Sequence, residues 1–547
     1  MLPPFQVERH NRAKTKSRVL VTHPCLSTGV VVGAAILGVY IKHVAPGIAG
    51  GDAGELVAES CHLGTAHPPG YPLYTILNHV AVRFLPGILD SVGLKPGPGV
   101  DGRASPAWCA NAIASVMGAL AATFTAQSTY LLCTRWDGIG GGRRVRRRNA
   151  AQNSSAAVRQ DYSSSWGESD DVFKALASGC AAMLMAFSPL MWQYSVTTEV
   201  FALNNFLLSL LVSLALRFSF DRDLIHAAAG AFVSGLSLSN QHTSVLYVAP
   251  LAGWVMIQLV TSRCRFHPAL PWRRLAAETS ILAALLVVGL MPYAYLPLAG
   301  IYAPKPGSWG DVATWRGLLH HLRRGDYGTL RLYSGRVESS GQGVVDRVLM
   351  WFSNLSSAQG IRGIVPALAV VGMLSSLYMA RRNVSGTTAT THEKYCPIES
   401  EFSVQLITSK EAGNGRPSQK SVGHQEGKSI APEAEPCGDM TRDATKDSKI
   451  LNCCCAGSSD TQQGEVERST VAKVFASWDD EGLSAPTALL VALAVYVVVF
   501  HLLSNLPLDD PLLFGVHARF WMQPNIVVFV FCGAGVYWTF GLIRYVG

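Results

Sequence analysis

Charged residues are scarce in this sequence. Asp, Glu, Lys and Arg make up 15% of its 547 residues, whereas roughly a quarter is usual for a soluble protein. The net charge of +8 is gathered in short basic clusters between apolar segments, as in the cytosolic loops of membrane proteins. This balance excludes an ordinary soluble domain and indicates a polytopic membrane protein. Because no soluble nucleic-acid-binding module accompanies the basic clusters, we expect no nucleic-acid partner.

The short motifs of several soluble enzyme classes are also missing. The sequence has no P-loop of the form G-x-x-x-x-G-K-[ST], no G-x-S-x-G and no paired-histidine zinc motif. Its 12 cysteines show no paired spacing of the kind that binds metals. These absences argue against P-loop nucleotide hydrolysis, serine hydrolysis and zinc chemistry.

The apolar residues fall into about ten segments long enough to cross a bilayer. Pro189, Pro292 and Pro297 lie where kinked or terminal helix positions are expected. We therefore predict an all-α fold, a polytopic transmembrane helical bundle of about ten spans. The segments lie at about 26–44, 107–133, 175–193, 199–219, 224–240, 243–261, 277–298, 361–380, 486–506 and 524–543.

The charge between the segments predicts their orientation. Residues 1–25 are polar and basic, so we expect a cytosolic N-terminus. Counting spans from there places the loops 45–106 and 299–360 in the lumen. Residues 381–485 are polar and low in aromatics, which predicts a disordered cytosolic insertion before the last two spans.

One polar stretch follows the first apolar segment directly, GGDAGELVAESCHLGTAHPPGYPLY at Gly50–Tyr74. It places two carboxylates, Asp52 and Glu55, next to a membrane span, where a charge without a function is costly. Asp52 could instead be the N-cap of a helix, with Glu55 three residues on as in a capping box. That alternative does not account for HPPGYP at His67–Pro72, a run too rich in proline and glycine to lie inside a helix.

The predicted topology places the other polar clusters on the luminal side as well. They lie at Thr197–Asn205, Ser239–Ser244, Trp309–Tyr327 and His517–Asn525. Since the topology rests on charge and hydropathy, a shared active face is the simplest reason for this clustering. The candidate site residues are Asp52, Glu55, His67, Tyr71, Glu199, Asn204, Asn240, His242, Trp309, Asp311, Arg323, Arg324, Tyr327 and Arg519.

Several of these residues also have ordinary structural explanations. Glu199 could interact only with the dipole of the helix that it precedes, and His242 could be a hydrogen-bonding residue of a turn. Arg323 and Arg324 could be interfacial residues that extend toward water. An arginine at this surface would nevertheless suit a phosphate, because its planar fork binds phosphate oxygens bidentately.

The same stretches resemble a known family. GDAGELVAESCHLGTAHPPGYPLY is similar to the signature of GT-C type multi-spanning membrane glycosyltransferases, the protein O-mannosyltransferases. Their eukaryotic member in the endoplasmic reticulum acts on IPT domains of plexins and related receptors. The stretches around Glu199, Asn240 and Trp309 also resemble segments of the family. The resemblance covers about residues 26–380 and 486–547.

The resemblance implies a GT-C-like fold and transfer of mannose from dolichyl-phosphate mannose to Ser or Thr of luminal or secreted proteins. It implies a multi-pass protein of the endoplasmic reticulum membrane, with a lipid-linked sugar donor and a protein acceptor as partners. In the mechanism that we expect, Asp52 is the general base of a single inverting displacement, and Glu55 holds the acceptor or the loop. His67 orients the pocket, and Arg323 or Arg324 neutralises the leaving phosphate. We expect no required cofactor, and the need for a divalent metal is left open.

Two other functions fit a chain of this kind. One is a transferase that uses another sugar, glucose or arabinose, on a polyprenyl carrier, which the residues do not separate from mannose. The other is a transporter or lipid flippase, which should show two related halves and polar residues at mid-membrane. The sequence shows no internal repeat, and its polar clusters lie at one face, so a transferase is the expected function.

Three features depart from the family. Gly51 stands where an aromatic residue is usual, and residues 381–485 are inserted. The C-terminal luminal repeat domain of the eukaryotic members does not follow Gly547, either because this lineage lacks it or because the chain is incomplete. The acceptor proteins are therefore left open.

The topology can be tested with sealed microsomes. Because the N-terminus and the 381–485 loop both adjoin basic clusters, we predict that both are cytosolic. Protease added outside the vesicles should cut the loop, as detected through a tag placed within it. Full protection of the loop, relieved only by detergent, would contradict the topology and the luminal placement of the polar clusters.

Overall fold

The computed structural model of the protein describes residues 24–94, 104–134, 162–266, 271–302, 307–328, 342–387 and 484–546. These residues belong to one compact unit. They form helices joined by loops, and none of these ranges contains a strand. The predicted all-α fold is confirmed. Of the insertion predicted at 381–485, residues 388–483 lie outside the described ranges.

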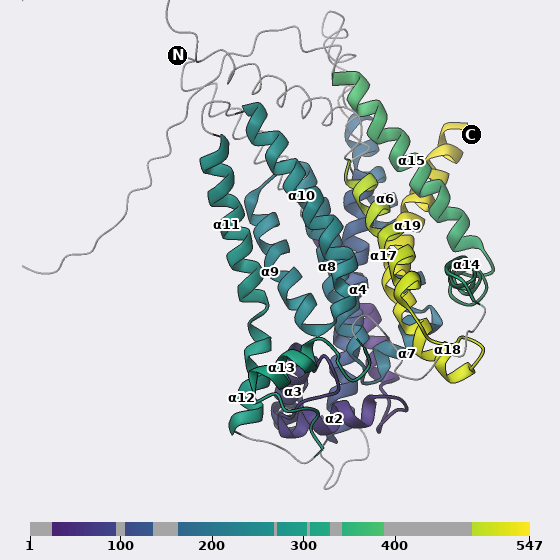
Figure 1. Ribbon diagram of the computed structural model, residues 1–547. Coiled ribbons are helices and arrows are strands. Elements are labelled where there is room, and N and C mark those ends of the chain that lie inside the picture. The colour runs from purple at the N-terminus through teal and green to yellow at the C-terminus, as the bar shows by residue number, and fades with distance from the viewer. Residues whose placement is uncertain are drawn as a thin grey trace, which may run out of the picture. The chain divides into compact units, whose positions relative to one another are not determined.

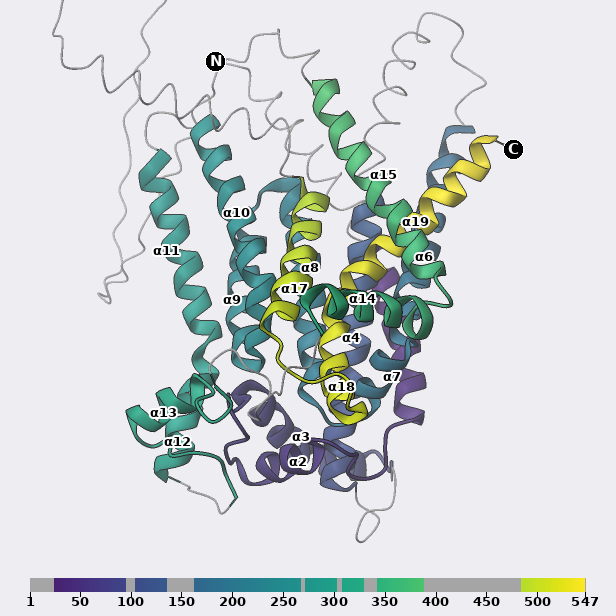
Figure 2. The ribbon, with the colours of Figure 1, turned by 45° about the vertical axis from the view of Figure 1, so that its right-hand side comes forward.

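The long helices run side by side in both views of the chain (Figures 1 and 2). Their apolar residues come from almost every position rather than from one face, as expected for helices that pack in a membrane. They are the helix Pro24–Lys42 and α4 (Pro106–Thr134), α6 (Tyr162–Ala186), α8 (Val200–Asp221), α9 (Leu224–Asn240), α10 (Val245–Phe266), α11 (Pro271–Gly289), α15 (Ile364–Thr387), α17 (Ala485–Leu503) and α19 (Met522–Val546).

Further helices gather toward one end of the long ones, the lower end in Figure 1. This is the end that the sequence predicts to be luminal. They are α2 (Ala53–His62), α3 (Pro72–Ser91), α7 (Pro189–Val196), α12 (Tyr295–Tyr302), α13 (Trp315–Leu322) and α18 (Pro511–Ala518). Another short helix, α14 (Val344–Asn354), lies about midway along the bundle (Figure 1). Single helical turns join neighbouring helices: η2 (His242–Ser244), η3 (Met291–Ala294), η4 (Leu355–Gln359) and η5 (Arg519–Trp521).

Fewer helices qualify as spans than the ten predicted. Within the described ranges, six helices are long and apolar enough to cross a membrane, or up to nine spans if each of three bent pairs counts as one. The tenth predicted span is α9, whose 17 residues rise about 26 Å, at the lower limit for a span. It nevertheless leads back to the end of the bundle at which α8 begins, because the start of α8 and the turn η2 after α9 line the same cavity. Two of the bends fall at Pro189 and Pro292, where the sequence predicts kinked or terminal helix positions. The chain turns by 71° before Pro189 and by 43° at the break before Pro292.

Small residues bring two of the long helices into close contact. Gly372 in α15 faces Gly535 in α19, and a Cβ on either residue would collide with a backbone carbonyl of the other helix. Glycine pairs of this kind let membrane helices pack backbone to backbone. The contact fixes α19, and therefore the turn η5 at its start, relative to the rest of the bundle.

Candidate active site

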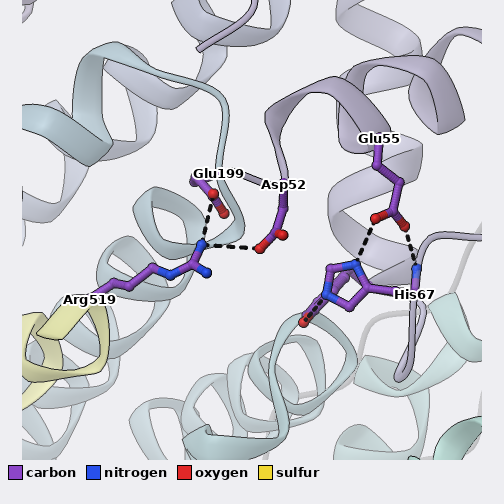
Figure 3. A network of polar contacts seen from close by, with 6 residues as sticks. Asp52, Glu55, His67, Glu199 and Arg519 are labelled. Atoms are coloured by element: carbon purple, nitrogen blue, oxygen red, sulfur yellow. Dashed lines mark hydrogen bonds and ion pairs between the residues drawn. The ribbon is translucent and has the colours of Figure 1, made fainter. Parts of the chain in front are cut away.

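Asp52 directly precedes α2, but its side chain does not cap that helix. The cap position makes no side-chain hydrogen bond, and its backbone is right-handed rather than extended. The carboxylate, 37% exposed, is instead directed toward Arg519 (Figure 3). The capping explanation of Asp52 and Glu55 is therefore wrong, and the reason is that a stronger charged partner competes with the helix end for the carboxylate.

A buried asparagine fixes the loop that leads into α2. Asn111 of α4 is fully buried and donates from Nδ2 to the carbonyl oxygens of Ala45 and Gly47, at 2.8 and 2.9 Å. Its Oδ1 accepts a hydrogen bond from the Thr198 amide at 2.7 Å. One side chain thus holds the start of α2 beside the start of α8. Sequence reasoning missed Asn111, although an amide within an apolar segment is an unusual residue at membrane depth.

Arg519 joins Asp52 to Glu199. Its Nη1 donates to Asp52 Oδ2 at 3.0 Å and to Glu199 Oε1 at 2.9 Å (Figure 3). The guanidinium also lies over the ring of Phe201, with its central carbon 5.5 Å from the ring centroid. The Arg519 side chain is only 11% exposed and that of Glu199 only 5%. Water therefore screens the three charges less than it would at an open surface.

Burial raises the pKa of Glu199 to about 7. Desolvation is the largest cause; the positive charge of Arg519 opposes it, and the negative charge of Asp52 adds to it. The second carboxylate oxygen, Oε2, is buried and has no hydrogen-bond partner among the described residues. Glu199 precedes α8 without capping it through its side chain. It can thus take up or release a proton near neutral pH, which is typical of a functional carboxyl group.

Glu55 fixes the turn that begins at His67. Its Oε1 accepts a hydrogen bond from the His67 amide at 2.6 Å, and its Oε2 lies 3.0 Å from Nδ1 of the same residue (Figure 3). The other ring nitrogen, Nε2, lies 3.2 Å from the hydroxyl of Tyr71. Glu55 therefore holds both the backbone and the ring of His67.

The HPPGYP turn brings the chain back toward the site through unusual backbone conformations. The Pro68–Pro69 bond is cis, and Gly70 and Tyr71 have φ of 93° and 41°. Glycine adopts a positive φ without strain. A Cβ at Gly70 would also approach His321 Nε2 to 3.1 Å, so the glycine lets the buried His321 side chain pack against the turn.

The polar groups line one cavity of about 240 Å³. Its walls come from the start of α2, the HPPGYP turn, the start of α8, the turn η2, the segment after α13 and the end of α18. The candidate residues that line it are Asp52, His67, Tyr71, Glu199, His242, Arg324, Tyr327 and Arg519. Segments from across the whole chain thus meet at one site.

The adjacent residues Arg323 and Arg324 face different pockets. Arg324 lines the cavity, with its guanidinium carbon 5.1 Å from the centroid of the Tyr327 ring. Its Nε is buried and makes no hydrogen bond within the described ranges. Arg323 is exposed and, with Asp311, lines a second polar pocket of about 610 Å³. Of the two, only Arg324 can meet a ligand in the cavity.

Asn204 and Asn240 support the cavity wall without lining it. Asn204 Oδ1 accepts a hydrogen bond from Ser244 Oγ at 2.7 Å, and Asn240 Nδ2 donates to the Val200 carbonyl oxygen at 3.2 Å. These bonds fasten α8 to α9 and to the turn that follows it. His242, which lines the cavity, lies with its Nε2 2.7 Å from the hydroxyl of Tyr293, a residue that sequence reasoning missed.

Trp309 and Asp311 lie at the margin of the site. The Trp309 ring centroid is 6.4 Å from that of His67, and its amide donates to the Thr65 carbonyl oxygen at 2.9 Å. Asp311 Oδ2 accepts a hydrogen bond from Thr314 Oγ1 at 2.8 Å. Trp309 therefore packs beside His67 without lining the cavity, whereas Asp311 belongs to the second pocket.

Three apolar residues of the cavity wall could not be recognised from the sequence as part of the site. Leu506, Leu513 and Val516 come from the segment between α17 and η5. Arg347 of α14 holds this segment by donating from Nη2 to the Leu506 carbonyl oxygen at 2.8 Å. Apolar residues in such a segment look like ordinary packing residues, so only the structure assigns them to the wall.

The arrangement can remove a proton and hold an anion in the same cavity. Of the three bonded charged groups, Asp52, Glu199 and Arg519, Asp52 is the most exposed, and it can therefore contact a substrate hydroxyl. Arg324 offers a cation on another wall of the cavity. Within the described ranges, no group of three or more His, Cys, Asp or Glu side chains is arranged to hold a metal ion.

Comparisons with known proteins show that this region is similar to one family. Residues 52–263 match the family described as the Protein O-mannosyl-transferase TMEM260 N-terminal domain. The chain is 32% identical over 320 residues to Protein O-mannosyl-transferase TMEM260 of Mus musculus, with 58% of this chain and 36% of the relative covered. It is 23% identical over 520 residues to Protein O-mannosyl-transferase tmem260 of Dictyostelium discoideum, with 92% of this chain and 44% of the relative covered.

The chain spans less than half the length of these two relatives. No solved structure matches it. The region that matches the family begins at Asp52 and includes Glu199. The family resemblance predicted from the Gly50–Tyr74 stretch is confirmed.

Replacing Glu199 by glutamine should change how stability depends on pH. An acid whose pKa is higher in the folded than in the unfolded protein binds more protons when folded, so its contribution to stability falls as pH rises between the two values. Those values are roughly 4.3 when unfolded and about 7 when folded. In detergent, the melting temperature of the wild type relative to Glu199→Gln should therefore fall as pH rises from about 4 to about 7. A difference that stays constant with pH would show that Glu199 does not titrate in this range.

Proposed function

We propose that this chain, a relative of the protein O-mannosyl-transferase TMEM260 family, transfers mannose from dolichyl-phosphate mannose to Ser or Thr hydroxyls of luminal proteins. The observation that carries the proposal is the cavity in which Asp52, Glu199 and Arg519 meet at one end of the helices. The names of the relatives support the reaction class. The site of action would be the luminal face of the endoplasmic reticulum membrane, with the N-terminus in the cytosol.

In this mechanism, Asp52 is the general base. Arg519 binds its Oδ2, so Oδ1 is the oxygen that faces the acceptor. As the hydroxyl oxygen attacks C1 of mannose, its proton moves to Asp52, and the bond between C1 and the phosphate oxygen breaks with inversion. General-base assistance of this kind is worth about 10²–10⁴-fold. Arg519 and Glu199 keep Asp52 in place, and dolichyl phosphate leaves.

The leaving phosphate would meet Arg324. This arginine lines the cavity, and its buried Nε is available for a hydrogen bond. A guanidinium can bind two phosphate oxygens at once, and its charge offsets the charge that develops as the sugar departs. Arg519 already donates to two carboxylates, which makes it the less suitable of the two cavity cations for this role.

Arg324 substitutions should affect use of the donor, with Arg323 as the matched control. Arg324→Lys keeps the charge but loses the planar guanidinium that binds two phosphate oxygens at once, so the KM for dolichyl-phosphate mannose should rise. Arg324→Ala should raise this KM further. Arg323→Ala removes a neighbouring exposed charge and should leave transfer within a few-fold of the wild type. Equal, near-normal kinetics for both alanine variants would remove Arg324 from the phosphate site.

Asp52→Asn should abolish transfer while leaving the protein inserted. Asparagine has a similar shape but cannot accept the proton, so transfer should fall by roughly 10²-fold or more, with less effect on donor binding. Asp311→Asn is the matched control, because Asp311 is an exposed carboxylate outside the cavity. The assay supplies purified protein with a Ser/Thr peptide and, in parallel, dolichyl-phosphate mannose or dolichyl-phosphate glucose.

Three outcomes would contradict the proposal. Normal transfer by Asp52→Asn would show that Asp52 is not the base. Normal transfer by Asp52→Asn together with loss in Glu55→Gln would assign the base to Glu55. Transfer of glucose in preference to mannose would keep the reaction class and change the donor.

A further inference from the structure

Glu55, His67 and Tyr71 form a hydrogen-bonded chain that the base mechanism leaves unused, and His67 and Tyr71 line the cavity. Glu55 Oε2 lies 3.0 Å from His67 Nδ1, and His67 Nε2 lies 3.2 Å from the Tyr71 hydroxyl. None of the three is bonded to the Asp52–Arg519–Glu199 triad, and Figure 3 shows Glu55 and His67 on the opposite side of Asp52 from Arg519. The cavity thus holds two separate sets of groups that can move a proton.

The contacts of Glu55 determine the direction in which a proton can move along these three hydrogen-bonded side chains. Both carboxylate oxygens accept from His67, one from the amide at 2.6 Å and one from the ring nitrogen at 3.0 Å. A carboxylate cannot donate, so Nδ1 carries a proton, and Nε2 is the ring position that exchanges a proton with Tyr71. A carboxylate that fixes an imidazole in this manner is the usual arrangement of a histidine that transfers protons.

Tyr71 is held at the cavity end of the chain. Its backbone lies in the left-handed region, with φ of 41°, a conformation that a bulky residue rarely adopts and that is common at functional sites. Its side chain lines the cavity and is only 8% exposed. Burial raises the pKa of Tyr71, so the phenol stays protonated and can pass a proton on.

The hydrogen-bonded series Glu55–His67–Tyr71 ends close to Arg324, the residue proposed to bind the donor phosphate. The His67 and Tyr327 rings have centroids 6.5 Å apart, and the Arg324 guanidinium lies over the Tyr327 ring. Among the charges that act on the Tyr71 hydroxyl, that of Arg324 has the largest effect, ahead of Asp52, Glu199 and Arg519. Asp52 is already bound to Arg519. A donor phosphate at Arg324 would therefore lie on the Tyr71 side of the cavity.

We propose that Glu55, His67 and Tyr71 form a relay that protonates the leaving phosphate. The proposal rests on the function proposed above. As the bond between C1 and the phosphate oxygen breaks, its electron pair stays on that oxygen, which takes the proton of the Tyr71 hydroxyl. Tyr71 takes a proton in turn from Nε2 of the His67 imidazolium, which becomes neutral and keeps its Nδ1 proton toward Glu55. Solvent restores the His67 proton after the products leave, and Asp52 independently takes the acceptor proton.

In this scheme, Tyr71 is a catalytic residue, whereas His67 and Glu55 act through it as positioning residues. The titratable groups that face His67 are Glu55 from α2, Tyr71 from the same turn, Glu199, His321 from α13, and Tyr327.

The test measures kcat and KM for purified protein with dolichyl-phosphate mannose and a Ser/Thr peptide. Tyr71→Phe should lower kcat by roughly 10²-fold with little change in donor KM. His67→Gln should likewise lower kcat with little change in donor KM, because the proton supply to Tyr71 is lost. Glu55→Gln should fall by roughly 10-fold, since the ring loses its charged partner.

Tyr295→Phe is the matched control. Its hydroxyl donates to the Gly64 carbonyl oxygen at 2.6 Å and fastens the same loop from outside the cavity, so the variant should keep kcat and donor KM within a few-fold of the wild type. Normal kcat in either Tyr71→Phe or His67→Gln would overturn the relay. A wild type that transfers no sugar would instead overturn the proposed function.

Discussion

The guanidinium of Arg519 is the contact on which the arrangement of the site depends. It bonds to two carboxylates that lie 467 and 320 residues away in the sequence. Without it, Asp52 and Glu199 would be two neighbouring negative charges in a poorly screened cavity, and one of them would have to be protonated. Because Arg519 sits in the turn between α18 and α19, the glycine contact between α15 and α19 helps to set its position. The last helix of the chain thus positions a group at the start of α2.

At this end of the bundle, side chains that fasten the helices to one another also position the charged groups of the site. Asn111 holds the segments before α2 and α8 together, while Asn204 and Asn240 tie α8 to α9 and to the following turn. None of these amides lines the cavity, yet each fixes a segment that carries a charged group. A substitution at any of them would act on the site through the backbone, which is how a shell of hydrogen bonds tunes the groups that it supports.

Much of the fold followed from the sequence, because hydropathy and proline positions determine where membrane helices form and bend. The apolar segments all correspond to helices, and Pro189 and Pro292 lie at bends. The span count was less accurate, since α9 is helical but short. Within the site, the Gly50–Tyr74 stretch identified Asp52, Glu55 and His67 because they are adjacent in the sequence. The charged partner of Asp52 comes from the other end of the chain, so neither the Asp52–Arg519 pair nor the choice of Arg324 over Arg323 could be predicted from the local sequence pattern.

The central claim is that this cavity attaches mannose to proteins that enter the lumen. Glycopeptide mass spectrometry of luminal and secreted proteins, from cells with and without this chain, tests it most directly. The account predicts Ser or Thr peptides that carry a single hexose, identified as mannose, in cells with the chain. These peptides should be absent from cells without the chain and restored by its re-expression. An unchanged set of hexose-bearing peptides in cells without the chain would contradict the account.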